Sequence, residues 1–180
     1  MRFVALLRGM NLAGNRLSVA DLRSAATEIG WQDVRTYLAS GNLVATATGT
    51  RAALARQLRA STAQRGLDVP VLVVPRDELT RALRGCPFHP RRGKDVHAFF
   101  CWDAPVLDAA AVSRLRGPGE ALQVRGRIVW LHTPDGLGRS VLGAKLPTVV
   151  TGTEMTARNL NTVRALAELL DEPRRAPTGR

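Results

Sequence analysis

Two short segments of the chain combine Arg, Asn and Gly in a pattern suited to binding an anion. Residues 9–16 read GMNLAGNR and follow Arg8, and residues 40–42 read SGN. An arginine offers a rigid fork of N–H donors to phosphate or carboxylate oxygens, and glycines let backbone amides approach the same oxygens. We therefore predict that these segments contribute to an anion site. The candidate ligand-binding residues in them are Arg8, Asn11, Arg16, Ser40, Gly41 and Asn42.

A third polar pair, Arg158-Asn159, stands at the start of the last helix, which the apolar pattern predicts over residues 156–170. Two interpretations remain open for this pair. It hydrogen-bonds a ligand, or it braces the interface between the two halves of the chain. The second is favoured because that helix must dock against something and Asn159 flanks its apolar stripe, but both residues stay candidates for ligand binding.

Cysteine and histidine residues do not form a convincing metal site. Cys86 and His89 with His97 and Cys101 resemble a ligand set. However, His97 and Cys101 are four residues apart on a predicted strand, about 13 Å at about 3.3 Å per residue, which is too far to share one ion. We therefore predict no metal.

A glycine-rich stretch in the second half also falls short of a known nucleotide motif. Residues 138–146 read GRSVLGAKL and resemble a phosphate loop. That motif needs Lys directly after the second Gly and a hydroxyl residue after the Lys. Here Ala144 intervenes and Leu146 follows, so we predict an ordinary helix and no cofactor.

The sequence leaves open whether the protein is an enzyme. It has no Gly-x-Ser-x-Gly motif, no standout pair of carboxylates, and no cue that ties its three histidines to Ser40 or Ser140. We expect a binding protein. The alternative is an enzyme that acts on a small phosphorylated or carboxylated substrate, with Ser40 or Tyr37 supplying the reactive hydroxyl.

The elements that would position the anion site follow from the apolar pattern of residues 1–74. The order is βαββαβ, which is the split βαβ or ferredoxin-like arrangement, and the fold class is α+β. A short helix is predicted after it, at residues 77–83. Strands are expected at residues 2–8, 34–39, 43–48 and 69–74, and helices from Ser18 to Gly30 and at 51–65.

In this arrangement three loops meet at one end of the sheet: residues 9–16, 40–42 and 65–68. The helix that begins at Ser18 starts at the same end, with Asp21 forming a pair that resembles a capping box. Its free amides and dipole favour an anion there. Alternatively, the Gly and Asn residues only form turns and the arginines are solvated.

The second half partly repeats the first, with a strand at residues 96–102, a helix at 106–115 and a hairpin around Arg125-Gly126. We predict a ferredoxin-like subdomain at 1–90, a second, smaller α+β subdomain at 91–171 and a flexible tail at 172–180. The first strand is apolar on both faces, whereas both helices of such a unit cover only one. We expect the second half to pack on the other face, with a homodimer as the alternative, so the protein is a monomer or a homodimer.

The net charge of +11 suggests nucleic acid as a further partner. The excess lies in residues 1–94, which hold 15 basic and 6 acidic residues. Base stacking requires aromatic side chains on the central strands, and Phe3 alone is available there. Any such binding would involve phosphates without base-specific contacts and would weaken steeply with salt.

The expected compartment follows from what the sequence lacks. Its only N-terminal apolar run, residues 3–7, is too short for a signal peptide or a membrane span. The two cysteines have no CxxC spacing and are interpreted as buried thiols of a reducing compartment. We expect a cytoplasmic protein with no membrane association.

Three motifs resemble the signatures of DUF1697, a bacterial family known as a domain of unknown function. They are residues 7–14 (LRGMNLAG), 36–42 (TYLASGN) and 156–163 (TARNLNTV). The family pattern has RGINVGG, TYxQSGN and TxRNWNTV, so this chain departs from it at several positions, and Leu160 replaces an aromatic. The resemblance implies two ferredoxin-like halves and no particular activity. It also implies that Arg8, Asn11, Ser40, Gly41, Asn42, Arg158 and Asn159 occupy signature positions.

Overall fold

The structure is a computed structural model that describes residues 1–10, 17–38 and 41–173. The chain divides into two compact units of mixed α+β structure. Unit 1 comprises Met1–Thr80 and Ala165–Arg180, and unit 2 comprises Arg81–Arg164. The predicted division near residue 90 therefore differs from the observed one, and most of the predicted tail, residues 174–180, lies outside the described residues.

The boundary between the units falls inside two helices, α3 (Arg76–Arg84) and α7 (Leu160–Asp171). The sequence analysis assigned the whole last helix to the second half. The structure corrects this, because the part of α7 from Ala165 onward belongs to unit 1. A helix is continuous in the apolar pattern, so periodicity alone gives no sign that its two ends belong to different units.

Unit 1 has the predicted order βαββαβ. Its strands pair antiparallel in the order β2-β3-β1-β4, which is the strand order of a split βαβ sheet. The elements are β1 (Arg2–Leu7), α1 (Val19–Glu28), β2 (Gln32–Thr36), β3 (Asn42–Thr46), α2 (Arg51–Ala63) and β4 (Val71–Pro75).

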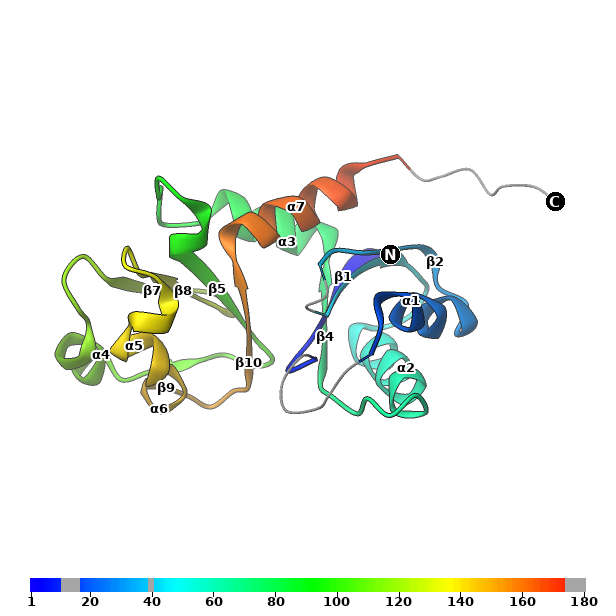
Figure 1. The fold of residues 1–180 in the computed structure, drawn as a ribbon, viewed down its shortest axis with the longest axis horizontal. Coiled ribbons are helices and arrows are strands. Elements are labelled where there is room, and N and C mark those ends of the chain that lie inside the picture. The colour runs from blue at the N-terminus through cyan, green and yellow to red at the C-terminus, as the bar shows by residue number, and fades with distance from the viewer. Residues whose placement is uncertain (11–16, 39–40, 174–180) are drawn as a thin grey trace. The chain divides into compact units, whose positions relative to one another are not determined.

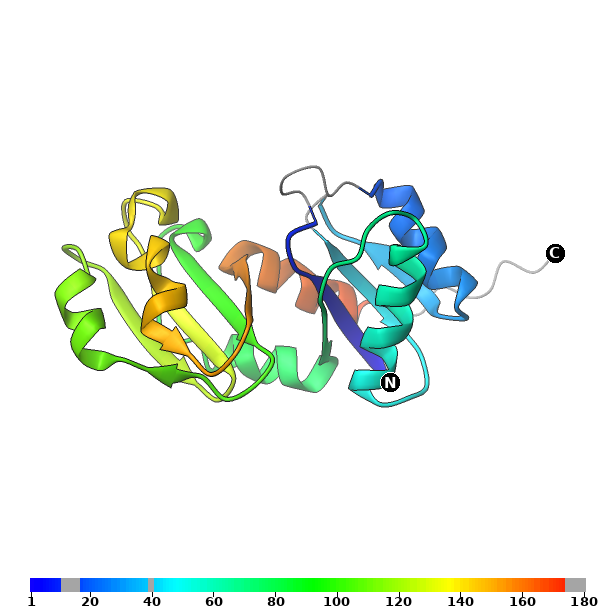
Figure 2. The same ribbon diagram turned by 90° about the horizontal axis from the view of Figure 1, so that it is seen from below.

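The core of unit 1 lies between this sheet and helices α1 and α2, which cover the same face (Figures 1 and 2). Phe3 of β1 points into it and meets the Trp31 ring edge to face, with ring centroids 4.9 Å apart. Leu22 of α1 and Leu58 of α2 are almost completely buried in the same cluster. Burying one such side chain contributes about 1.5–3 kcal/mol, so the helical layer is fixed to the sheet mainly by these contacts.

Helix α1 begins where the sequence predicted. The Ser18 hydroxyl oxygen accepts a hydrogen bond from the Asp21 amide at 3.0 Å, and the same hydroxyl donates to the Asp21 carboxylate at 2.6 Å. This reciprocal pair satisfies one of the free amides of the first turn. It also places a carboxylate of the protein itself at the helix start.

Charged side chains bind the end of α7 to the rest of unit 1. The Arg2 guanidinium donates to the carbonyl oxygens of Glu172 at 2.6 Å and Leu169 at 3.0 Å. Nε of Arg76 donates to the Asp171 carboxylate at 2.8 Å. Carbonyl groups of the last helical turn have no partner within the helix, so Arg2 satisfies groups that α7 leaves free.

Unit 2 repeats the strand order of unit 1. Its four-stranded antiparallel sheet runs β10-β5-β8-β7, and a two-stranded sheet pairs β6 with β9. The strands are β5 (Val96–Cys101), β6 (Val106–Leu107), β7 (Ala121–Arg125), β8 (Ile128–His132), β9 (Val150–Thr151) and β10 (Met155–Asn159). The helices are α4 (Ala109–Leu115), α5 (Val141–Ala144) and α6 (Leu146–Val149), with short 3₁₀ turns η1 (Gly93–Asp95) and η2 (Leu137–Arg139).

Three predicted helices of the second half are corrected. Residues 155–159 form strand β10, so helix α7 begins only at Leu160. The reason is local: Oδ1 of Asn159 accepts a hydrogen bond from the Thr162 amide at 2.9 Å, which makes Asn159 the cap that starts the helix. Asp108 does the same for α4, so residues 106–107 precede that helix as a strand. The single helix predicted at 138–146 is a series of short helical turns.

Candidate functional site

The loop end of unit 1 confirms the predicted convergence of segments as far as the described residues show it. The amide of Leu7, at the end of β1, donates to the Gly41 carbonyl at 2.8 Å. The next amide, of Arg8, donates to the Pro70 carbonyl at 3.0 Å, just before β4. The end of β1, Gly41 of the β2–β3 turn and Pro70 before β4 therefore lie together.

Within this end, Gly41 and Asn42 have packing roles. Gly41 has a φ of +72°, and a Cβ there would lie 2.9 Å from Cβ of Leu7 and 3.2 Å from Cβ of Met10. Asn42 is completely buried, and its side-chain amide donates to the Tyr37 carbonyl at 3.0 Å. Both residues therefore hold a compact turn.

The remaining candidates at this end are one exposed arginine and three residues outside the described part of the chain. Arg8 is exposed. Asn11, Arg16 and Ser40 lie outside the described residues. The start of α1, which was expected to attract an anion, already carries the Asp21 carboxylate. A negative group there uses the favourable position that a ligand would take.

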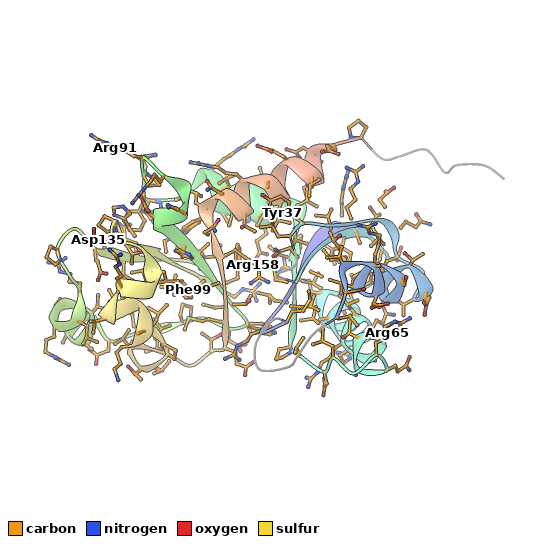
Figure 3. All side chains as sticks on the ribbon, in the orientation of Figure 1. Tyr37, Arg65, Arg91, Phe99, Asp135 and Arg158 are labelled. Carbon is orange, nitrogen blue, oxygen red and sulfur yellow. The ribbon has the colours of Figure 1, made fainter. Side chains whose placement is uncertain are left out.

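Arg158 and Asn159 lie on β10 and point to opposite faces of the sheet, because neighbouring strand residues alternate. Arg158, labelled in Figure 3, is 9% exposed, and its guanidinium donates to the Thr156 hydroxyl at 2.9 Å and to the Ala157 carbonyl at 2.7 Å. Burial lowers the pKa of Arg158 to about 10. Asn159 stands directly opposite His97 of β5 in the strand register. The two predicted partners therefore belong to different environments.

Asn159 lines a polar pocket of about 620 Å³ that lies entirely within unit 2. The pocket forms at the end of the sheet where β5 begins and where β8 and β10 end. Asp135, on the loop between β8 and η2, is labelled in Figure 3. The lining residues are Arg92, Lys94, Asp95, His97, Pro134, Asp135, Gly136, Leu137, Arg139 and Asn159.

One arginine ties the two loops of the pocket together. Nε of Arg92 donates to the Asp95 carboxylate at 2.8 Å, and another nitrogen of the same guanidinium donates to the Pro134 carbonyl at 2.9 Å. The Thr133 amide donates to the Asp95 carbonyl at 2.8 Å. The pairing with Asp95 also raises the pKa of Arg92. Arg92 therefore stabilises the wall of the pocket.

Gly93 explains how η1 approaches the start of α7. A Cβ at this position would overlap Oδ1 of Asn161, so a larger residue would displace that side chain. The close approach places Lys94 and Asp95 beside the end of β10, where Asn159 lies. The glycine thus contributes to the assembly of the pocket without facing a ligand itself.

Two cationic side chains of the pocket have no partner in the part of the chain that the structure describes. The side chains of Lys94 and Arg139 make no hydrogen bond or ion pair with any described residue, and both residues are exposed. Arg92 is already paired with Asp95, which leaves Asp135 as the other carboxylate of the lining. Two available cations against one carboxylate give the pocket a positive balance.

His97 contributes a neutral ring. Burial lowers the pKa of His97, and the nearby Asp95 carboxylate opposes that shift only in part. The imidazole is therefore uncharged at neutral pH. Its Nδ1 atom is buried and has no hydrogen-bond partner among the described residues, and the same holds for Oδ1 of Asp95. Unsatisfied buried polar atoms are uncommon and cost free energy.

The reactive groups of the lining are amine, imidazole and carboxylate groups. It contains no serine, threonine, tyrosine or cysteine, so it offers no hydroxyl or thiol nucleophile. Within the described ranges, no group of three His, Cys, Asp or Glu side chains lies close enough to hold a metal ion. Cys86 and Cys101 are free thiols, and burial raises the pKa of Cys101 to about 11.

Sequence reasoning missed this pocket apart from Asn159. Residues 91–94 were predicted only to begin the second subdomain, and residues 133–137 received no structural or functional assignment. A signal was present in the basic run Arg91–Lys94 with its internal glycine. What joins that run to Arg139 and Asn159 is the register of the strands, because β5 pairs with both β8 and β10.

No helix among the described residues has the length and apolar character needed to cross a bilayer. A comparison with curated proteins gives no match.

A solved structure shows a similar fold. It is that of the conserved bacterial protein SP0830 from Streptococcus pneumoniae, which is 23% identical in sequence, with a TM-score of 0.71. The match covers 95% of this chain and 98% of that one, so the likeness in fold spans both units.

The sequence profile of a family described as "Protein of unknown function (DUF1697)" matches residues 1–130. This range includes all of the described sheet of unit 1 and, in unit 2, strands β5, β6 and β7 and the first three residues of β8. Together with the signature motifs quoted above, the match shows that the chain belongs to the DUF1697 family.

Proposed function

We propose that the protein binds a small molecule carrying a phosphate or carboxylate group in the pocket of unit 2. The observation that carries this proposal is the presence of Lys94 and Arg139 on one pocket lining, neither engaged by a described residue. Hydrogen bonds from charged donors to an anion contribute more than neutral ones, typically about 1.5–3 kcal/mol each. Asn159 and the neutral His97 add groups that can orient such a ligand.

The size of the pocket supports a small-molecule ligand. Its volume of about 620 Å³ falls within the usual range of about 300–1,000 Å³ for such sites. The lining carries no hydroxyl or thiol nucleophile, and its cationic side chains suit the binding of an anion. The anion expected at the loop end of unit 1 is thus proposed for a different site, one that retains Asn159 from the original candidates.

Calorimetric titration with inorganic phosphate and pyrophosphate tests the proposal. Lys94→Gln and Arg139→Gln each remove one cation, and we expect each to weaken binding about tenfold. Arg114→Gln is the matched control, because Arg114 is an exposed arginine of α4 in the same unit that does not line the pocket. It should leave the affinity unchanged.

A further variant separates this pocket from the loop end of unit 1. Arg8→Gln should bind both anions as tightly as the unmodified protein. If Arg8→Gln loses binding while Lys94→Gln and Arg139→Gln keep it, the anion site lies at the loop end and the pocket proposal is wrong. Equal weakening by Arg114→Gln would show a general charge effect and would also overturn the proposal.

A further inference from the structure

A second, smaller hollow adjoins the polar pocket. Its volume is about 280 Å³, and it lies wholly within unit 2. Three residues line both hollows: Asp135, Gly136 and Arg139. The two spaces are therefore neighbours along the same segment of chain.

The smaller hollow is more apolar than the polar pocket. Leu115 at the end of α4, Pro118 and Val141 at the start of α5 contribute hydrocarbon surface to it. Val141 is 59% exposed. Together with Leu115 and Pro118, Val141 gives this hollow apolar surface that a ligand can cover.

Glu120, the acidic residue that lines this hollow and not the polar pocket, already has a hydrogen-bond partner. The Glu120 carboxylate accepts a hydrogen bond from the Gly117 amide at 2.8 Å and so stabilises the turn between α4 and β7. It forms part of the wall. Apart from Asp135 and Arg139, which it shares with the polar pocket, the hollow offers the hydrocarbon surface of its three apolar residues.

Gly136 lines both hollows. Gly136 has a φ of +93°, and a Cβ built there would meet no atom within 4 Å. No neighbouring side chain therefore fills the space beside it. The aliphatic stem of an arginine can cover apolar surface while its guanidinium stays with a charged group, and Arg139 lines both hollows.

We propose that the ligand is amphipathic: its anionic group lies with Lys94 and Arg139, and a short alkyl or aryl substituent lies between Leu115, Pro118 and Val141. This inference rests on the proposed anion site and names the class of molecule that the site takes. A phosphate or carboxylate with an apolar substituent fits both hollows, whereas a free inorganic anion fills only the polar one.

A homologous series of ligands tests the inference. We would titrate inorganic phosphate, ethyl, butyl and hexyl phosphate at fixed pH and ionic strength, with hexanol as the probe that lacks the anion. Each buried methylene should tighten binding by up to about fourfold. The gain should level off once the hollow is full, and hexanol should bind far more weakly than hexyl phosphate.

Two valine variants locate the apolar contact. Val141→Thr keeps the size of the side chain but places a hydroxyl in the hollow, so the gain from each methylene should fall while the affinity for inorganic phosphate stays the same. Val106→Thr is the matched control, because Val106 is 63% exposed on β6 of the same unit and lines neither hollow. It should leave the whole series unchanged.

The outcomes separate this inference from the proposed function. If inorganic phosphate binds and Lys94→Gln weakens it, but alkyl chains add nothing, the amphipathic ligand is refuted and the anion site stands. If the gain is present but equal in Val141→Thr and Val106→Thr, the apolar substituent binds elsewhere and the inference is wrong. If neither inorganic phosphate nor any alkyl phosphate binds, the proposed function itself fails.

Discussion

Replacing Gly41 by alanine should destabilise unit 1 for two reasons that add. The φ of +72° is a left-handed conformation that costs a residue with a Cβ about 1–2 kcal/mol. The added Cβ would also lie 2.9 Å from Cβ of Leu7 and 3.1 Å from the Leu7 carbonyl oxygen. Overpacking of this kind typically adds about 1–3 kcal/mol. The expected loss is therefore about 2–5 kcal/mol.

Gly30→Ala isolates the conformational part. Gly30 has a φ of +83° in the same unit, but a Cβ there would meet nothing within 4 Å. Its loss should stay at about 1–2 kcal/mol. Hydrogen exchange of the β1 and β3 amides, read by mass spectrometry, measures both variants. The difference of about 1–3 kcal/mol corresponds to exchange that is about 5- to 150-fold faster in Gly41→Ala.

Equal exchange rates in the two variants would refute the packing argument. Gly41 would then require only its backbone conformation, and its approach to Leu7 would relax without cost. A large difference, together with unchanged phosphate binding in Gly41→Ala, would show that this signature glycine serves the fold.

Three further predictions concern His97, Ser18 and Asn159. Because burial lowers the pKa of His97, the unfolded chain takes up this proton first as the pH falls below about 6.5. Stability should therefore drop between pH 7 and pH 5, and His97→Gln should flatten that drop in urea unfolding; equal slopes would contradict the assignment. Ser18→Ala should cost about 1 kcal/mol of stability by removing the cap of α1, whereas Ser18→Asp should cost little, as thermal unfolding would show. Asn159→Ala should cost about 1 kcal/mol of stability by removing the cap of α7. Asn159→Asp should keep the cap and the stability but weaken phosphate binding, because its carboxylate would line the pocket. Unchanged phosphate binding of Asn159→Asp in calorimetry would count against the pocket.

The fold of unit 1 could be predicted because its signals are local. Ser18 with Asp21 marks a helix start through hydrogen bonds that span three residues, and the alternating apolar residues of β1 mark a buried strand. The strand order then follows from the element order alone. Strand β10 was missed because Leu160 and Val163 set a helical period that extends backward over residues 156–159, and only the Asn159 cap interrupts it.

The site was harder to predict, for a physical reason. The pocket draws Lys94, Arg139 and Asn159 from segments separated by tens of residues, and strand register brings them together. The sequence motifs around Gly41 and Asn42 were conspicuous because turns impose strict local demands. Residues of this kind are selected by the backbone conformation of the turn. In the structure Gly41 fits the close packing against Leu7, and Asn42 donates a hydrogen bond to the Tyr37 carbonyl.

The bonds from Arg2 to the end of α7 have a consequence for synthesis of the chain. Arg2 leaves the ribosome near the beginning of translation, but its partners Leu169 and Glu172 leave near its end. At about 5–20 residues per second, the stretch between Thr80 and Glu172 takes about 5–18 s to translate. During that interval the nascent β-sheet of unit 1 lacks its last helical segment. A ribosome-bound chain halted before residue 165 should therefore expose Arg2 to proteases that the finished protein resists.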